Sequence, residues 1–278
     1  MKKVKYKSKN RYKEFLHAAK IIAKKISKID GVVGILATGG LGRGHCDDFS
    51  DLDLIVYVDD KKVKEIEKYI AVGFLRYKEI DFDTPVVSYQ KALREKSPSR
   101  YWSQVMRWDR ENSQILFDRG GKIAKLLKQK LVFPDSEQKR ILSYHGQLVD
   151  DLLNYDFRLW EKRGGVINMS HCLVHAAEHM ILWIYAKNKK FRPYTTKWLF
   201  YHLENNSVPE AKYFNIIKKA YLNPIKTLKQ AKGVRDSLVK LSKEIGIKFY
   251  FEDLEALHKR SRENWKKAKD KTKFYLSW

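Results

Sequence analysis

The sequence predicts a mixed α/β sheet domain over residues 1–132, followed by an all-α helical bundle domain over residues 133–278. Three observations support this division. Short runs rich in β-branched residues alternate with helical patterns before residue 130, long helical patterns replace them afterwards, and the sequence Phe-Pro-Asp at 133–135 separates the two. A chain of 278 residues with 44% apolar residues can form a sizeable hydrophobic core in each part.

The first domain is predicted to contain several short strands separated by helices. The predicted strands are runs with β-branched or aromatic residues, at 32–39, 52–58, 79–89 and 114–118. The segments around them have apolar residues at helical spacing. We therefore expect helices near residues 10–28, 60–71, 89–96 and 121–130.

The second domain is predicted to be helical throughout. Asp135 and Gln138 have the spacing of a capping box at the start of its first helix. Glycine or proline interrupts the helical pattern at Gly164, Gly165, Pro193, Pro209 and Pro224. The helices are expected near residues 136–162, 166–188, 194–205, 209–222, 225–245 and 252–272, which together form a bundle.

The chain has a formal charge of +24, because its 57 Lys and Arg residues outnumber its 33 Asp and Glu residues. A surface of this sign attracts anions, so RNA is one candidate partner. The longest apolar run, at 180–186, is far shorter than the ~20 residues that span a bilayer. The basic amino-terminal segment also lacks the ~7–15 apolar residues of a secretory signal. With two separated cysteines, Cys46 and Cys172, we expect a soluble cytoplasmic protein with reduced thiols and no membrane partner.

A glycine-rich stretch lies between two predicted strands and reads GGLGRGHCDDFSDLDL, at residues 39–54. A dinucleotide-binding turn also follows a strand, but it needs a helix after the glycines and an acidic residue ~20 positions later. Here six residues, 45–50, separate Gly44 from Asp51, and a strand follows at once. The chain has no GxxxxGK[ST] pattern here either. Both a Rossmann site and a Walker loop are therefore excluded.

Asp51 and Asp53 occupy alternate positions at the start of the predicted strand. Because side chains alternate across a strand, both carboxylates are expected on one face. The opposite face would then hold Leu52, Leu54, Val56 and Val58. Two carboxylates ~7 Å apart repel each other unless a cation lies between them, and hard oxygen ligands suit Mg²⁺. The alternative is a pair of solvated aspartates at a strand end.

This segment resembles the nucleotidyltransferase superfamily of the DNA polymerase β type, whose signature is Gly-Gly or Gly-Ser, a spacer, and Asp-x-Asp. Here Gly39 and Gly40 are followed by the nine residues 41–49, and then by Ser50, Asp51 and Asp53. The match covers about residues 30–120, with a predicted strand on each side of the motif. It implies a nucleotidyltransferase-like fold for the first domain.

The resemblance also implies a reaction. A nucleoside triphosphate, such as ATP, would place its phosphates on the amides of Gly39 and Gly40, with two Mg²⁺ ions on the aspartates. A hydroxyl of an acceptor would attack the α-phosphorus, and pyrophosphate would leave. Glycine lets backbone N–H groups approach phosphate oxygens, and paired metal ions stabilise the attacking and leaving oxygens. Arg43 could neutralise the triphosphate, and Ser50 would cap or line the turn.

The family needs a third carboxylate on a neighbouring strand, which completes the metal site and helps to take the acceptor's proton. The predicted strand 79–89 offers Glu79, Asp81 and Asp83, which alternate onto one face. In this family the carboxylate typically precedes the next helix by a few residues, and Ser88 resembles the cap of that helix. We therefore expect Asp83, with Asp81 as the alternative and Glu79 as a solvated strand end.

The helical half is expected to bind the acceptor. Its segment KNKKFRPYTTKWLFYHL, residues 187–203, resembles a part of the carboxyl-terminal domains of antibiotic-type nucleotidyltransferases. The resemblance implies that Lys197 could reach the triphosphate as a point charge. The alternative is a solvent-exposed lysine beside a core tryptophan, Trp198.

A histidine cluster suggests a competing metal site. His175, Glu178 and His179 have the spacing of the inverted zinc-protease motif, and His171 lies one turn earlier. Glu252 or Glu255 could supply a third ligand. The alternatives are histidines that line the acceptor cleft or form hydrogen bonds within the bundle.

Three classes of function follow from these patterns. The first is a Mg-dependent enzyme that transfers a nucleoside monophosphate, AMP from ATP, to a hydroxyl of a small molecule. The second is transfer to RNA or to a protein. The third is a basic RNA-binding protein without catalysis, which the intact Asp51 and Asp53 argue against. Aromatic and basic residues interleave at 100–110 and 258–278, as they do where proteins bind nucleic acid, and the alternative is core aromatics beside a solvated charged face.

Overall fold

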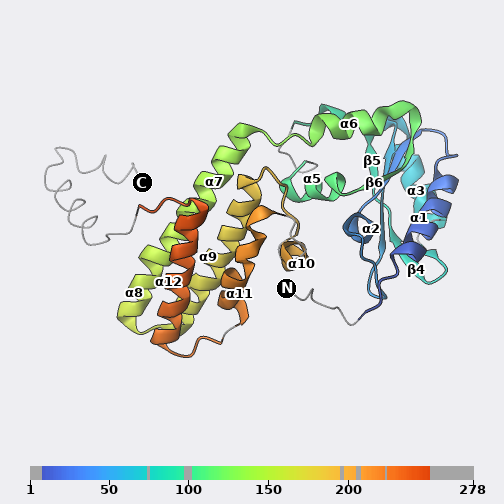
Figure 1. Ribbon diagram of the computed structural model, residues 1–278. Helices are drawn as coiled ribbons and strands as arrows, with labels where there is room; N and C mark the ends of the chain where they lie inside the picture. Colours follow the sequence, from blue (N-terminus) through green and yellow to red (C-terminus); the bar gives the residue numbers. More distant parts are fainter. Residues whose placement is uncertain are drawn as a thin grey trace. The chain divides into compact units, whose positions relative to one another are not determined.

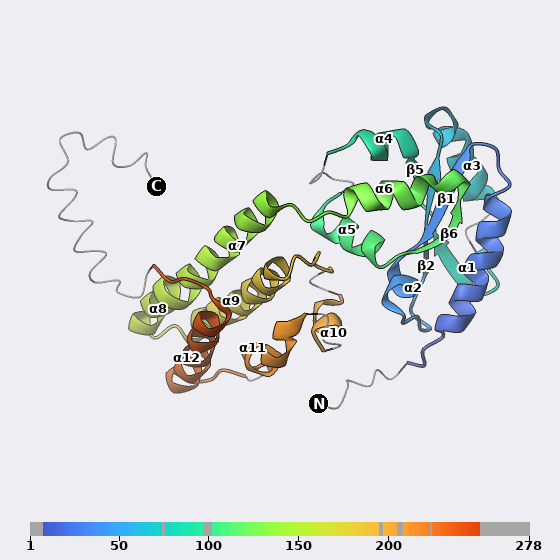
Figure 2. The same cartoon turned by 45° about the horizontal axis from the view of Figure 1, so that its top comes forward.

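The structure is a computed structural model that describes residues 8–73, 76–96, 102–194, 197–204, 208–222 and 224–250. The chain divides into two compact units, whose elements are labelled in Figures 1 and 2. The first unit contains residues 1–133 and 191–202, and the second contains residues 134–190 and 203–278.

A mixed six-stranded sheet organises the first unit. Its strands are β1 (Val32–Ala37), β2 (Leu52–Val58), β3 (Arg76–Tyr77), β4 (Ile80–Asp83), β5 (Val86–Ser88) and β6 (Gln114–Asp118). The order is β3-β4-β2-β1-β6, and β5 also pairs with β2. β1 is antiparallel to both β2 and β6, whereas β4 and β5 are parallel to β2. The predicted mixed α/β sheet is confirmed.

Helices cover both faces of this sheet (Figure 1). Residues of α1 (Tyr12–Ile26) and α3 (Val63–Gly73) pack in one hydrophobic cluster with β1 and β2. Residues of α4 (Tyr89–Arg94) and α6 (Lys122–Lys130) pack in a second cluster with the opposite face of the same strands. The central strand β2 is therefore covered on both faces, and its positions 52 and 54–58 are buried.

Four details of the first unit differ from the sequence-based expectation. The expected single strand at 79–89 is two strands, β4 and β5, because the chain breaks at Thr84 and Pro85 and proline cannot donate to a ladder. A one-turn helix, α2 (Gly39–Arg43), follows β1 where no helix was expected. The short strand β3 was also not expected. Helix α5 (Gln104–Glu111) was not expected either, because its buried face includes two arginines, Arg107 and Arg110, in place of apolar residues.

Two 3₁₀ turns, η1 (Asp60–Lys62) and η2 (Arg119–Gly121), precede α3 and α6.

The second unit is helical, as predicted. Its elements are α7 (Asp135–Asp150), the π-helix η3 (Asp151–Asp156), α8 (Phe157–Arg163), α9 (Val166–Lys187), η4 (Pro209–Tyr213), α11 (Phe214–Leu222) and α12 (Leu228–Ile245). Helix α10 (Leu199–Glu204) crosses from the first unit into the second. The long helix α9 contacts α7, α8, α11 and α12 (Figure 2). The expected helix at 252–272 lies outside the described residues.

The start of α7 is not stabilised by the expected capping box. Asp135 pairs with Lys189, with the carboxylate oxygen 2.6 Å from Nζ, and the Gln138 amide donates to the carbonyl oxygen of Ala186 at 2.9 Å. A capping box does form at α12, where Thr227 and Gln230 satisfy each other's backbone N–H groups.

The segment 191–202 belongs to the first unit, although a division at residue 132 would assign it to the helical part. The ring of Phe191 stacks on Phe133, with centroids 5.2 Å apart, and the Arg107 guanidinium lies 4.5 Å from its centroid. Aromatic packing therefore returns this segment to the sheet unit, and sequence periodicity carries no information about such a return. Over the part of the chain that is described, none of the helices combines the length and the apolar character needed to cross a bilayer.

Candidate functional site

The glycine turn and β2 are joined directly beside the candidate aspartates. The N–H of Thr38, the residue after β1, donates to the carbonyl oxygen of Asp53 at 3.0 Å. Gly39 follows with φ +53°, a conformation that favours glycine. A Cβ atom at Gly39 would lie only 1.6 Å from Oδ2 of Asp53. Glycine is therefore required at position 39 because the Asp53 carboxylate lies against the backbone there.

Asp53 lies on β2, and Asp51 lies directly before this strand. Leu52, Leu54, Val56 and Val58 all belong to the core cluster under α1 and α3. Asp53 therefore points to the other face of the sheet. Asp53 is partly buried and Asp51, just before the strand, is exposed.

The structure also brings Asp83 next to Asp53 in the sheet. In the parallel pairing of β2 with β4, the Cα atoms of Asp53 and Asp83 are register partners. The pKa of Asp53 is raised to about 6, chiefly by burial and then by the negative charges of Asp51 and Asp83, against the opposing charge of Arg43. Asp51, Asp53 and Asp83 therefore form one electrostatically coupled group.

Asp81, the alternative third carboxylate, has a different partner. Its Oδ1 lies 3.3 Å from Nε of Arg76 on β3, in an exposed ion pair. The Ser88 hydroxyl caps α4 by accepting the N–H of Lys91 at 2.9 Å, as the sequence predicted. Along the chain, Asp83 is the acidic residue of β4 that is closest to this cap, and Glu79 is exposed before the strand begins.

Arg43, the last residue of α2, lies near the same group. Its Cζ is 4.0 Å from the centroid of the Trp198 ring. Burial lowers the pKa of Arg43, and the charges of Asp53 and Asp109 oppose that effect. Its Nε is buried and, within the described part of the chain, has no hydrogen-bond partner. The guanidinium is thus held on an aromatic platform with donor capacity left over.

The loop between α2 and β2 is braced by Ser50. Its hydroxyl donates to Oδ1 of Asp47 at 3.1 Å and accepts the Asp47 N–H at 3.0 Å. Ser8 donates to the other oxygen of Asp47 at 2.7 Å. Ser50 therefore closes the turn that leads into Asp51. Its contact with a nucleotide remains a prediction.

Lys197 is exposed and lies next to Trp198 in the segment that packs with the first unit. The structure therefore places its backbone one residue from the aromatic platform of Arg43. Its role as a point charge for a triphosphate also remains a prediction.

Sequence reasoning missed three residues of this site. Asp109 on α5 is partly buried, and burial raises its pKa to about 6 against the charges of Arg110 and Arg43. Burial also raises the pKa of Tyr194, with contributions from Asp109 and Asp53. His202 packs against Trp108, with ring centroids 4.6 Å apart. Burial and then the charge of Arg43 lower its pKa to about 4. The sequence signal that could have identified Asp109 is its position as an acid between an aromatic residue, Trp108, and a basic one, Arg110.

The donor chemistry of the aspartates suits Mg²⁺. In the part of the chain that the structure describes, no three His, Cys, Asp or Glu side chains are grouped so as to hold a metal ion by themselves. Mg²⁺ at nucleotide sites is usually bound by one or two carboxylates together with phosphate and water oxygens, without a complete protein cage. The like charges that raise the pKa of Asp53 are those that a cation would offset.

The histidine side chains of the second unit are arranged differently from those of a zinc-protease motif. Nδ1 of His179 lies 3.0 Å from Nδ1 of His145 on α7, so the two rings can share one proton. The rings of His171 and His175 lie side by side on α9, with centroids 4.2 Å apart. Burial lowers the pKa of His179, which favours its neutral form. The geometry fits histidines that form hydrogen bonds within the bundle. The proposed third ligands, Glu252 and Glu255, lie outside the described residues.

Comparison with known proteins gives likeness in structure only. No protein-family model matches the chain, and no curated protein matches it. A nucleotidyltransferase-like protein from Exiguobacterium sibiricum 255-15 is similar with a TM-score of 0.40 and 16% identity, over 82% of this chain and 74% of the other. A spectinomycin adenyltransferase from Enterococcus faecialis, solved with ATP and spectinomycin, is similar with a TM-score of 0.35 and 13% identity, over 82% of this chain and 99% of the other.

Proposed function

We propose that this protein is a Mg-dependent nucleotidyltransferase that transfers AMP from ATP to a hydroxyl of a small molecule and releases pyrophosphate. One observation carries the proposal. The Asp53 carboxylate lies against the glycine turn, Asp83 is its register partner on β4, and the charge of Asp51 acts on the same group. Coupled carboxylates beside a glycine turn are suited to binding a metal-bound polyphosphate.

The carboxylates would share the metal and the proton chemistry. Asp51, Asp53 and Asp83 would hold Mg²⁺, which when bound stabilises charge on the attacking and leaving oxygens. Asp83 is exposed, so an acceptor hydroxyl can approach it. We assign it the additional role of accepting the proton of that hydroxyl.

The triphosphate would be held by the glycine turn and by Arg43. The first N–H groups of a helix have no partner within the helix, and α2 begins at Gly39. Arg43 has an unpartnered buried Nε on the same short helix, among the described residues, and its charge acts on Asp53. A guanidinium pairs well with phosphate oxygens. Lys197 and Ser50 are proposed to contribute further phosphate contacts from either side of this turn.

The local charge at the site is opposite to that of the whole chain. Although the chain has a formal charge of +24, Asp53 is surrounded by the negative charges of Asp51, Asp83 and Asp109 and by the positive charge of Arg43. A small acceptor, whether neutral or cationic, would therefore meet no net repulsion at the aspartates. Transfer to RNA or to a protein is the second candidate function, which the basic chain favours.

The test is a calorimetric titration of the metal-stripped protein with a non-hydrolysable ATP analogue, with and without Mg²⁺. Wild-type protein should bind the analogue at least about tenfold more tightly with Mg²⁺. Asp53→Asn should lose this dependence and keep its fold, because it removes one of several like charges. Glu67→Gln, an exposed carboxylate on α3, is the control for the change in charge. Equal metal-dependent binding by wild type and Asp53→Asn would reject the site.

A further inference from the structure

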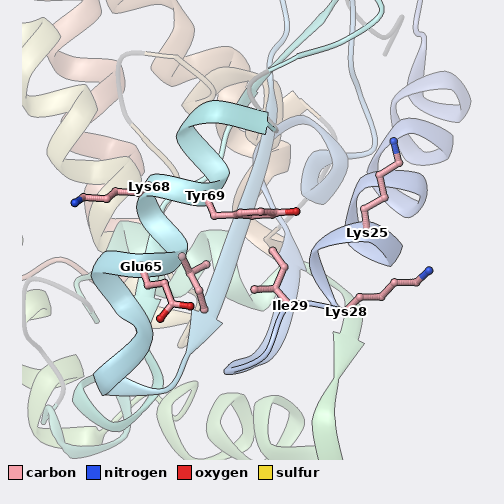
Figure 3. Close-up of a pocket in the computed structure, with 7 residues that line it drawn as sticks. Lys25, Lys28, Ile29, Glu65, Lys68 and Tyr69 are labelled. Carbon is pink, nitrogen blue, oxygen red and sulfur yellow. The ribbon is translucent and has the colours of Figure 1, made fainter.

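A groove of about 910 Å³ lies between the end of α1 and the side of α3. Figure 3 labels most of the residues that line it. The lining residues are Lys25, Lys28, Ile29, Glu65, Ile66, Lys68 and Tyr69. We call it the α1–α3 groove. It is apolar at the base, where Ile66 is buried and Ile29 partly buried, and charged along its rim.

The α1–α3 groove is remote from the aspartates. β1 starts at Val32, three residues after Ile29, and ends at Ala37 beside the glycine turn. A strand of this length spans about 16–20 Å. The groove therefore lies at the end of β1 opposite to Gly39, and the nucleotide proposed above does not account for it.

The rim of the groove carries more positive than negative charge, with three lysines and one glutamate among the residues that line it. Nζ of Lys62 lies 2.9 Å from a Glu65 carboxylate oxygen and 3.8 Å from one of Asp30, so these acids are already paired. Lys25, Lys28 and Lys68 are exposed. A lysine in the last turn of a helix stabilises the helix end, which explains Lys25 alone. Lys28 lies beyond the end of α1 and Lys68 lies on α3, so stabilisation of a helix end does not apply to them.

Tyr69 adds an aromatic surface between these charges. It is 56% exposed. In Figure 3 its ring extends from α3 toward the side of Lys25 and Lys28, while Lys68 extends away on the other side. Lysines near an exposed aromatic ring supply two contacts that bind single-stranded nucleic acid. The cations bind phosphates, and the ring stacks on a base.

We propose that the α1–α3 groove binds single-stranded RNA or DNA, with a base stacked on Tyr69 and phosphates on Lys25, Lys28 and Lys68. An acidic peptide would use the lysines but would gain little from an exposed phenol ring. A bilayer would require a flat or convex apolar face, and here the apolar residues form the base of a groove. The site is independent of the proposed transfer reaction, since it does not include the aspartates.

The test is fluorescence anisotropy with a labelled oligouridine of about 12 nucleotides, without nucleotide or metal, at about 50 mM and about 200 mM salt. The test variant is Lys25→Glu/Lys28→Glu. The matched control is Lys125→Glu/Lys128→Glu, an exposed pair with the same spacing on α6, which covers the opposite face of the sheet. Each Lys→Glu change lowers the formal charge by two, so both double variants have a formal charge of +20 instead of +24.

The groove variant should bind at least about tenfold more weakly and respond less to salt, and the control should lose no more than about threefold. Tyr69→Ala should weaken binding about fivefold or more without a change in salt response, and Tyr69→Phe should bind like the wild type. Circular dichroism verifies folding, and Tyr69→Leu replaces Tyr69→Ala if the latter unfolds. Asp53→Asn should bind RNA normally, which separates this site from the transfer site.

Three outcomes would overturn the proposal. Equal losses in the two lysine doubles would assign RNA binding to the overall charge. Full binding by Tyr69→Ala or Tyr69→Leu would leave a polyanion site without base stacking. Competition by a polyglutamate peptide as strong as that by the oligonucleotide would identify an acidic protein partner instead.

Discussion

The Cζ of Arg43 lies 4.0 Å from the centroid of the Trp198 ring, which joins the end of the glycine turn to a segment far along the chain. A flat guanidinium on an indole face is a favourable cation–π arrangement. It fixes the direction of a side chain that would otherwise have several rotamers. Trp198 is therefore a positioning residue for Arg43.

Trp198→Leu is expected to weaken binding of the ATP analogue about threefold to tenfold, because Arg43 loses its platform. Trp198→Phe, which keeps an aromatic face, should recover most of the affinity. Titration calorimetry measures both, and a thermal melt checks that folding is unchanged. If Trp198→Leu and Trp198→Phe bind equally well, the ring does not position Arg43.

Gly39→Ala should abolish nucleotide binding, because the new Cβ would lie 1.6 Å from Oδ2 of Asp53 and displace that carboxylate. Gly44→Ala is the matched control. Gly44 also has a positive φ, +73°, but a Cβ there would meet no atom within 4 Å. Both variants should lose about 1–2 kcal/mol of unfolding free energy for the left-handed conformation, and only Gly39→Ala should lose binding. Equal binding by the two variants would contradict the described approach of Asp53.

Asp83→Asn should lower kcat about 100-fold or more, because it removes a carboxylate that is the register partner of Asp53. Asp81→Asn should stay within about threefold of the wild type, since it breaks only the exposed ion pair with Arg76. The measurement is steady-state pyrophosphate release once an acceptor is found. Before that, Mg²⁺-dependent affinity for the analogue ranks the two variants. Similar effects from both would reject Asp83 as the third carboxylate.

Asp109→Asn should stabilise the protein at pH 8 and leave its stability at pH 4 unchanged. The pKa of Asp109 is raised to about 6 when folded, chiefly by burial, and is about 3.9 when unfolded. The protonated form thus favours folding, and that contribution is lost as the pH rises through 6. Asparagine remains neutral, so the variant should gain about 1–3 kcal/mol at pH 8. Urea unfolding at the two pH values measures this, and a gain of the same size at pH 4 would refute the assignment to ionisation.

Much of the fold can be predicted from the sequence because its signals are local. The alternation from Leu52 to Val58 predicts which residues enter the core, and the core cluster contains the expected four. The helical periodicity of the second half likewise predicts α9 and α12 to within a few residues, whereas the single helix expected at 136–162 is α7, the π-helix η3 and α8 in succession. Helix α5 was missed because its buried positions include Arg107 and Arg110, which a hydrophobic pattern cannot identify.

The residues of the candidate site likewise divide into those that the sequence predicts and those that only the structure identifies. Asp51, Asp53 and Gly39 follow from spacing, since they lie within one turn and one strand. Asp81 and Asp83 share a face of β4, so periodicity cannot separate them. The pairing of β2 with β4 makes Asp83 the partner of Asp53 and leaves Asp81 to Arg76. The return of Trp198 to Arg43 and the burial of Asp109 beside them depend on contacts between distant segments.

The sequence by itself determined the division into a mixed sheet part and a helical part, the glycine turn and the two aspartates, because each depends on residues that are close along the chain. Only the tertiary structure decided which carboxylate is the register partner of Asp53, the platform under Arg43 and the groove beside Tyr69. These depend on strand register and on packing between segments, which are set by the lowest free energy of the whole unit and leave no local pattern.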